Sequence, residues 1–300
     1  MLPSVTDGFG AVQRSNRRFV AMFVALAVIC AVLLVFRYPL WARWWGYRLV
    51  NTADSQARLG YVMRLAGLGE ASVPVGAGLL SRDDLELRSF GVFLLSRVNT
   101  PLSTRHLRRA IDDADEDLRR MALQEYARRP GAEVAAELVR RLDDSRPDVV
   151  GWAAVGLATD HLDAGLEPLG RAARSHPEAG VRVQAIQALA LTNRREPVDA
   201  LIDCLDDMGR YTGWTAIDAS AARAIRAASG RSASFGVDFP TDAPDAPPQY
   251  IVGQEADRAL RALTGVSFDY QVDDPEVRRN AIAAWREWQT ATPPRTEEAP

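Results

Sequence analysis

Small and large apolar residues return at a fixed spacing along most of this chain. Helix-like segments begin at six positions, separated by steps of 31, 31, 32, 36 and 60 residues: Leu87, Leu118, Val149, Val181, Ile217 and Val277. The residue four positions after each start is small: Gly91, Ala122, Ala153, Ala185, Ala221 and Ala281. The residue eight positions after each start is large: Leu95, Tyr126, Leu157, Leu189, Ile225 and Trp285. Stacked helices need such columns, because the small residue lets a neighbouring backbone approach and the large one fills the space beyond.

The same spacing predicts two helices in each repeat. A repeat of about 30 residues is typical of a solenoid, in which each unit packs on its neighbours. Shorter apolar segments precede the helices above, over residues 73–80, 102–111, 132–142, 162–174 and 198–205. Three of these segments run into a double acid, at 112–113, 143–144 and 206–207, which marks the turn into the second helix. Residues 53–66 predict one more helix, interpreted as a capping half-repeat.

An acid and an arginine occupy fixed places around four of the six starts. The acid stands three residues before the start and the arginine one residue after it: Asp84 and Arg88, Asp115 and Arg119, Glu178 and Arg182, Asp274 and Arg278. An acid at this position suits a helix N-terminus, where it accepts from free backbone N–H groups and meets the positive end of the dipole. The arginine either pairs with its own acid four residues earlier or bonds an adjacent repeat, forming a ladder along the stack. Both interpretations are structural rather than catalytic.

These residues resemble a known family. Helix pairs of about 31 residues, an acidic turn and an aliphatic-Arg-x-x-small-aliphatic second helix are similar to short bacterial HEAT repeats of the phycobilin-lyase-like kind, over residues 70–226 and 254–289. The resemblance implies a curved right-handed α-solenoid that serves as a protein-binding scaffold. The third and fifth repeats depart from the pattern, with Arg146 and Val150 in one and Trp214 and Asp218 in the other. Their stacking or their exposed surface should therefore differ.

The N-terminal part predicts a membrane anchor. Residues 1–18 form a polar arm, and residues 19–36, from Phe19 to Phe36, carry no charge. Eighteen helical residues span roughly 27 Å, close to the thickness of a bilayer core. Residues 37–52 follow as a juxtamembrane segment of aromatic and basic residues: Tyr38, Trp41, Trp44, Trp45 and Tyr47 with Arg37, Arg43 and Arg48. We therefore expect a single-pass transmembrane helix.

Three other interpretations of this apolar run were weighed. A cleaved signal peptide lacks a small-x-small site after the run, and a lipoprotein site at Cys30 is preceded by Ile29 instead of a small residue. A buried core helix is the third alternative. The compact cluster of Arg14, Arg17 and Arg18 favours a cytoplasmic N-terminus, which would leave the solenoid outside the cytoplasm.

The expected fold class is all-α: an α-solenoid of about six HEAT-like helix pairs preceded by one transmembrane helix. The solenoid is predicted over residues 53–228, with an insertion rich in Gly and aromatic residues at 208–214. A Pro- and Asp-rich loop follows at 229–250, then a C-terminal HEAT-like unit at 251–289 and a disordered tail at 290–300.

Composition narrows the chemistry. The formal net charge is -3, so no overall basic field favours nucleic acid. The chain has no lysine, which excludes Schiff-base chemistry and the P-loop. The two cysteines, Cys30 and Cys204, lie in unrelated segments. His106, His161 and His176 lack the spacing of metal ligands. Asp113, Asp115 and Asp117 begin like a calcium loop, but Leu118 replaces its glycine and Gln124 its final Glu.

We accordingly expect no catalytic residue, no metal and no cofactor. The expected partner is a protein, and the candidate partner-binding residues are Arg146, Trp152, Tyr211 and Trp214, because aromatic and arginine side chains anchor interfaces. Burial in the stack is an equal alternative for Trp152. Arginines crowd the second and third repeats, which leaves an anionic partner, including nucleic acid, as a less favoured alternative: Arg105, Arg108, Arg109, Arg119, Arg120, Arg128, Arg129, Arg140 and Arg141. A lyase-like, small-molecule-handling protein is the other alternative.

Overall fold

A computed structural model describes residues 38–213, 215–218 and 247–292, together with Met22, Val24 and Leu26. The predicted apolar span at 19–36 lies outside these residues, except for those three. Within the described ranges, no helix combines the length and the hydropathy needed to cross a bilayer. Two small strands accompany the helices, β1 (Arg210–Thr212) and β2 (Gln249–Ile251), and both are absent from the predicted all-α pattern.

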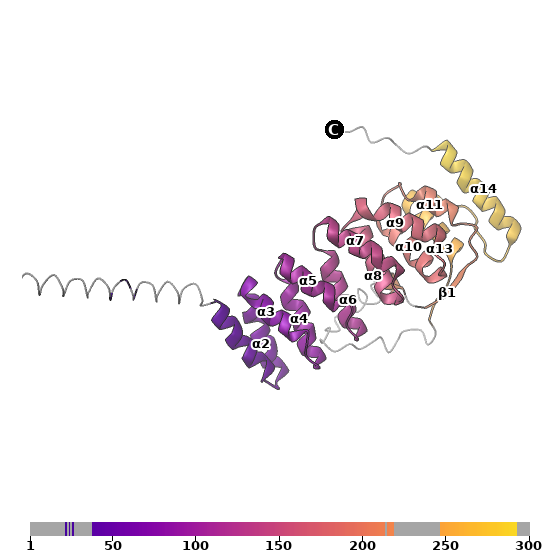
Figure 1. Cartoon of the computed structure of the whole chain (residues 1–300). Helices are drawn as coiled ribbons and strands as arrows, with labels where there is room; N and C mark the ends of the chain where they lie inside the picture. Colours follow the sequence, from indigo (N-terminus) through magenta and orange to yellow (C-terminus); the bar gives the residue numbers. More distant parts are fainter. Residues whose placement is uncertain are drawn as a thin grey trace, which may run out of the picture.

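The helices form two layers that run side by side along the stack (Figure 1). The first helix of each pair lies in one layer: α3 (Val73–Leu79), α5 (Pro101–Ala110), α7 (Ala132–Arg140), α9 (Leu162–Ser175) and α11 (Val198–Asp203). The second helix lies in the other: α2 (Ser55–Ala66), α4 (Leu85–Ser96), α6 (Glu116–Ala127), α8 (Pro147–Thr159), α10 (Ala179–Leu191) and α13 (Val252–Thr264). Short 3-10 turns precede α3 and α8, at η1 (Gly69–Ser72) and η2 (Arg141–Asp143). The chain is an all-α helical repeat protein with one added two-stranded sheet.

The two residue columns of the repeat are buried between the layers. Every described member of the small column is buried, and so is every described member of the large column: Gly91, Ala122, Ala153, Ala185 and Ala281, and Leu95, Tyr126, Leu157, Leu189 and Trp285. The predicted pair Ala221 and Ile225 lies outside the described residues. At Gly91 the close approach is to backbone, because an added Cβ would lie 2.9 Å from the carbonyl oxygen of Gly76 on α3.

The helix that completes the fifth pair comes later in the chain than the pattern predicts. The predicted start at Ile217 lies in a helical segment, residues 216–218, whose continuation lies outside the described residues, and α13 packs against both α10 and α11 in the second-helix position after α10. Its Val252, Ala256 and Leu260 repeat the start, small and large positions of the frame, and all three are buried. Gly253 stands where the arginine would be. An added Cβ there would lie 3.1 Å from the carbonyl oxygen of Asp207, so the backbone has no room for a side chain.

The stack begins earlier than predicted. Residues 38–50 are helical, and Ala42 and Leu49 are fully buried in a core cluster shared with α2 and α4. Trp45 of this helix stacks on Tyr61 of α2 with ring centroids 5.6 Å apart. The segment predicted as a juxtamembrane stretch of aromatic and basic residues therefore also forms the first helix of the first pair, with an inward apolar stripe packed in the core.

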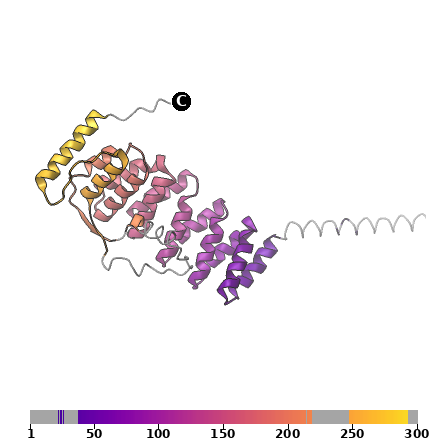
Figure 2. The ribbon, with the colours of Figure 1, turned by 180° about the vertical axis from the view of Figure 1, so that it is seen from behind.

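The last helix, α14 (Pro275–Ala291), closes the opposite end of the stack (Figure 2). Its Trp285 is fully buried, lies edge-on to Phe268, and donates from Nε1 to Asp257 Oδ1 at 3.0 Å. Asp257 is itself buried, and burial raises its pKa against the opposing effects of Trp285 and Arg261. The tryptophan that fills this end of the stack therefore has its indole N–H satisfied by a buried carboxylate, as a terminal cap requires.

Candidate functional site

The arginine column forms a ladder between repeats. Arg88, Arg119 and Arg182, with Arg58 before them, each bond an acid 25 to 29 residues further along the chain rather than the acid four residues before them. The rungs are Arg58 to Asp84, Arg88 to Asp113, Arg119 to Asp148 and Arg182 to Asp207. The alternative pairing inside one helix is absent from the described ion pairs. Packing explains the choice, since the acid's oxygens are already directed at its own helix N-terminus.

A second contact recurs along the ladder. The guanidinium also donates to the carbonyl oxygens of the loop before its own helix, five and six residues earlier. For Arg119 these are Ala114 O at 2.9 Å and Asp113 O at 3.0 Å, and for Arg182 they are Pro177 O at 3.0 Å and His176 O at 2.7 Å. Arg88 does the same with Asp83 and Arg82, and Arg278 with Val272. Each arginine thus holds its own loop, and three of them, Arg88, Arg119 and Arg182, also hold the next repeat, as Arg58 does.

The column acids cap helices, with one exception. Asp84 accepts from the N–H groups of Glu86 and Leu87, and Asp115 accepts from that of Leu118 at 3.0 Å. Asp274 accepts from Glu276 and Val277 in the same way. Glu178 makes no side-chain cap, and its backbone N–H donates to His176 Nδ1. The shorter aspartate fits the cap geometry and the longer glutamate does not.

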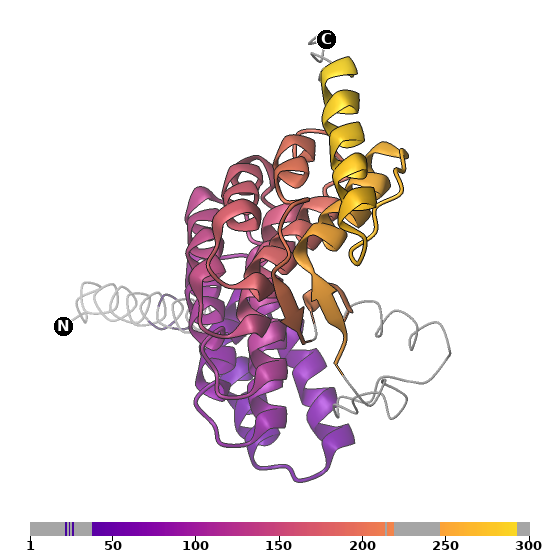
Figure 3. The same cartoon turned by 90° about the vertical axis from the view of Figure 1, so that its right-hand side faces the viewer.

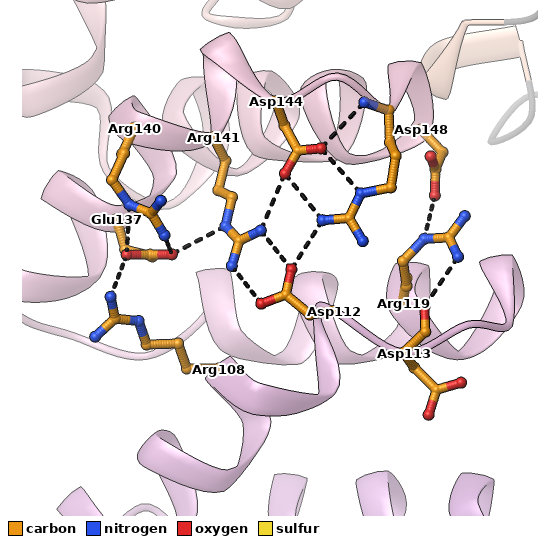
Figure 4. A network of polar contacts seen from close by, with 10 residues as sticks. Arg108, Asp112, Asp113, Arg119, Glu137, Arg140, Arg141, Asp144 and Asp148 are labelled. Carbon is orange, nitrogen blue, oxygen red and sulfur yellow. Dashed lines mark hydrogen bonds and ion pairs between the residues drawn. The ribbon is translucent and has the colours of Figure 1, made fainter.

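One rung of the ladder is missing, at α8, and a denser ionic network fills its place (Figure 4). Val150 occupies the arginine position, and Arg146 lies at the N-cap instead. Arg146 reaches back to Asp112 Oδ1 at 2.8 Å and to Asp144 Oδ1 at 2.9 Å. Arg141, only 7% exposed, binds the same two acids. Arg146 therefore links α8 to the preceding repeat rather than presenting a free cation.

The network continues through a buried carboxylate. Glu137 is 5% exposed and accepts from Arg108 Nη2 at 2.7 Å and from Arg141 Nε at 2.9 Å, with Arg140 beside it. Burial raises the pKa of Glu137, but the bonds from Arg140 and Arg141 outweigh burial and lower it overall. Arg141 and then Arg146 lower the pKa of Asp112 to about 2. The lowered pKa values keep Asp112 and Glu137 ionised at neutral pH, which suits structural ion pairs, whereas a proton-transfer site needs a group that titrates near the working pH.

The other candidate residues separate into different environments. Trp152 is 6% exposed and belongs to the main core, so its predicted role as a surface anchor is wrong. Its helix α8 lies between α6 and α10 in the second layer and is apolar on nearly every side. Trp214 lies outside the described residues. Tyr211 is half-buried on β1, close to the first turn of α10.

Four residues on and beside the two strands lie together, and we name them the hairpin cluster: Tyr211, Thr215, Asp218 and Tyr250. The strands pair antiparallel with Tyr211 opposite Tyr250, and the two rings stack with centroids 6.1 Å apart. The Tyr250 hydroxyl donates to Asp218, which also accepts from Thr215 Oγ1 at 2.6 Å. Burial first, and then Asp218, raises the pKa of Tyr250, so its hydroxyl stays protonated as a donor.

The hairpin is fixed to the second layer. Gly180 in the first turn of α10 leaves room for the ring of Tyr211, since an added Cβ would lie 2.8 Å from ring carbons. Figure 3 shows the two strands as orange arrows alongside the stacked helices. Gly253 N donates to Asp207 O at 2.8 Å and Val252 N to Gly209 O at 3.0 Å, which ties both ends of the insertion to one rung of the ladder. Sequence reasoning missed Tyr250 and Thr215 and singled out Asp218 only as a departure from the repeat pattern. The alternation around Tyr250 is too short to signal a strand.

Other polar groups do not converge. In the described ranges, no three His, Cys, Asp or Glu side chains are arranged to hold a metal ion. His161 contacts the carbonyl oxygen of Ala127, and His176 lies 3.5 Å from Asp143. Among the arginines of repeats two and three, seven have structural partners: Arg108, Arg119, Arg120, Arg128, Arg129, Arg140 and Arg141.

Comparisons with known proteins concern the fold. No family model and no curated protein matches the chain. Human deoxyhypusine hydroxylase, solved in complex with glycerol, is 17% identical over 87% of this chain and 99% of its own, with a TM-score of 0.42. A designed armadillo repeat protein in complex with the peptide (KR)4 is 18% identical over 75% of this chain and 99% of its own, with a TM-score of 0.33. An engineered protein is 17% identical over 76% of this chain and 97% of its own, with a TM-score of 0.33.

Proposed function

We propose that this chain is a membrane-anchored, HEAT-like repeat scaffold that binds a protein partner and carries no catalytic site. The binding surface is the hairpin cluster and the adjoining starts of α8 and α10. The proposal revises the predicted set of Arg146, Trp152, Tyr211 and Trp214: Tyr211 stays as an anchor, and Arg146 borders the surface as a fixed charge.

The observation that carries the proposal is the position of the insertion. A regular stack needs only a short turn between α11 and α13, but here residues 204–251 separate the two helices. Backbone hydrogen bonds fix both ends of that segment. Insertions in repeat proteins gather on one face, which is often the binding face. Here the insertion presents a stacked tyrosine pair beside the second-helix layer, and aromatic rings on a rigid support are typical of protein interfaces.

The polar residues support a scaffold over an enzyme. The ladder and the Arg141 network use their charges to join repeats, and none of these groups has a second role that a reaction would need. A curved stack of helix pairs offers an extended surface, which suits a protein or a peptide better than a small molecule. A small-molecule function, as the lyase-like resemblance implies, would require a ligand pocket among these groups.

The membrane anchor is proposed from the apolar run at 19–36. It holds the scaffold at the bilayer, with the solenoid on the extracytoplasmic side. Resistance of the full chain to alkaline extraction from membranes, with protease access to the solenoid only in spheroplasts, supports both parts. Extraction as a soluble protein would overturn the anchor, and protection of the solenoid would reverse the orientation.

Photo-crosslinking tests the binding surface. The photoreactive residue p-benzoylphenylalanine replaces Tyr211 in one variant and Leu102 in the control, because Leu102 is 48% exposed on α5 in the other layer. Irradiation of intact membranes should give a discrete protein adduct at position 211 and none at 102. Adducts of equal yield at both positions, or none at 211, would show that this face does not bind a partner.

An anionic partner remains the second candidate, through the two arginines of α5 that have no described ion pair, Arg105 and Arg109. Both lie near His106, and the pKa of His106 is lowered by burial and by these two charges. Nucleic-acid binding at this site would weaken steeply with added salt. Formation of the same protein adduct when irradiation is carried out at high salt would count against it.

A further inference from the structure

The helix at residues 38–50 has two apolar sides. Its inner side is buried against α2 and α3, with Ala42 and Leu49 in the core and Gly46 against Val75. Its outer side exposes four large apolar side chains, which we name the aromatic face: Leu40 at 54%, Trp41 at 51%, Trp44 at 50% and Tyr47 at 65%. A helix that is apolar all round is normally buried on every side. The aromatic face therefore lacks a cover within the described chain.

The position of the aromatic face is also unusual for a repeat protein. The helix lies at the N-terminal end of the stack, drawn in indigo in Figure 1, where a solenoid normally ends in a polar capping surface. At the opposite end, α14 buries Trp285 inside the stack and shows charged residues outward. The N-terminal end thus exposes large apolar rings, whereas the C-terminal end buries its tryptophan.

The charges around the aromatic face have one sign. Residues 8–53 contain six arginines and no acid, whereas residues 54–300 contain 30 arginines and 38 acids. Arg48 lies over the ring of Trp44 at 5.9 Å and donates to the hydroxyl of Tyr61 at 3.1 Å, and no described carboxylate pairs with it. Guanidinium groups beside Trp and Tyr rings match the headgroup layer of a bilayer, where the rings sit between apolar and wet regions and anionic lipids attract the arginines.

Continuity along the chain selects the occupant. The aromatic face begins at Leu40, four residues after the end of the apolar run at 19–36, and the described residues of that run, Met22, Val24 and Leu26, are helical and 55% to 58% exposed. A membrane-spanning helix delivers the next helix of the chain directly to the headgroup layer. A separate protein partner or a second copy would have no such reason to meet this face.

We propose that the aromatic face lies in the headgroup layer of the bilayer and sets the orientation of the solenoid. The inference rests on the membrane anchor proposed above. Because the same helix is fixed in the core by Ala42 and Leu49, contact with the membrane orients the whole stack rather than a loose tether. The first repeat then lies at the bilayer, and the hairpin cluster, near the far end of the stack, is held away from it.

Quenching of tryptophan fluorescence by brominated lipid tests the proposal in the full chain. The protein is reconstituted into vesicles of phosphatidylcholine and phosphatidylglycerol with bromine on the acyl carbons nearest the headgroup. The wild type should be quenched in part, and the double variant Trp41→Phe/Trp44→Phe should lose most of that quenching. The matched control, Trp288→Phe at the other end of the stack, should retain it.

The outcomes separate the two proposals. If the chain stays in the vesicles after alkaline washing but the double variant is quenched as strongly as the wild type, the aromatic face is not at the bilayer and the anchor still stands. If the chain washes off, both proposals fail. The number of chains in each particle is measured after reconstitution into nanodiscs. If Trp41 and Trp44 are not quenched and each nanodisc holds two chains, the face is assigned to a second copy and the inference is overturned. An unchanged far-UV circular dichroism spectrum verifies that the variants fold.

Discussion

Arg119 Nε lies 3.0 Å from Asp148 Oδ2, which joins α6 to the first turn of α8 in the next repeat. Both side chains are largely buried, at 12% and 17% exposure. The same guanidinium holds two carbonyl oxygens of the preceding loop. One side chain therefore fixes three segments that belong to two repeats.

Removal of this rung should destabilise the stack. Arg119→Ala leaves a shielded carboxylate and two carbonyl oxygens without donors, so the free energy of unfolding should fall by about 2 to 3 kcal/mol. Urea unfolding of the detergent-solubilised chain, followed by circular dichroism, measures the shift. Arg128→Ala is the matched control, because Arg128 is 63% exposed in an i,i+3 pair with Glu125 and should contribute only about 0.5 kcal/mol. Equal decreases in unfolding free energy for the two variants would mean that a ladder ion pair stabilises the fold no more than an exposed ion pair.

The small column should not tolerate added volume. Gly91→Ala places a methyl group 2.9 Å from the carbonyl oxygen of Gly76, so α3 and α4 must separate, at about 1 to 3 kcal/mol. Gly60→Ala on α2 meets nothing within 4 Å and should stabilise the helix by up to about 1 kcal/mol. Thermal unfolding of the two variants should therefore shift in opposite directions. A neutral or stabilising Gly91→Ala would contradict the close packing.

Acid should weaken the network around Asp112. Its pKa falls from the ordinary value of 3.8 to about 2 in the folded chain, chiefly through Arg141 and then Arg146. A lowered pKa stabilises the fold above the unfolded value, and this contribution is lost as the pH falls from about 4 to about 2. Asp112 is about half exposed, so solvent screening reduces the size of the effect.

The measurement compares wild type with Asp112→Asn by urea unfolding at successive pH values. The difference in unfolding free energy should be largest above pH 4, by about 1 kcal/mol, and should shrink below it. Asp163→Asn, at a side chain that is 95% exposed, serves as the control and should show no such trend. If the difference in unfolding free energy does not change with pH, Arg141 and Arg146 do not stabilise the ionised form of Asp112.

Cys204 should resist thiol reagents in the folded chain. Burial raises the pKa of its thiol to about 12, and Cys204, at the end of α11, is 2% exposed. The reactive thiolate is therefore scarce and shielded. Alkylation followed by mass spectrometry should leave the peptide containing Cys204 unmodified under native conditions and modified in denaturant. Rapid native modification would show that the α11 end of the stack opens readily.

Much of the fold could be predicted from periodicity. The starts at Leu87, Leu118, Val149 and Val181 lie on helices α4, α6, α8 and α10, because a column of small beside large residues has one compact solution in a helix stack. The helix-start acids Asp84 and Asp115 cap the predicted N-termini. These features depend on neighbours within one or two turns, and local sequence specifies them.

The candidate site was less predictable. Arg146 was expected at the surface, and Trp152 either at the surface or in the stack. A tryptophan in a helix does not reveal which neighbours cover it, and an arginine does not reveal which acid lies opposite. Tyr250 meets Asp218 across 32 residues, through a segment whose length carries no periodic signal. Sequence spacing also assigned the fifth second helix to Ile217, although α13 packs at that position.

The sequence by itself determined a stack of helix pairs, the capped helix starts and the apolar run at 19–36. The stack follows from the repeat period of about 31 residues, and the caps and the apolar run follow from shorter spacings. Only the tertiary structure decided which acid each arginine binds, where residues 38–50 belong and which residues gather at the hairpin. Those choices depend on contacts between segments 25 or more residues apart. Several acids could pair with each arginine, and the packing of the helices decides which acid lies within reach.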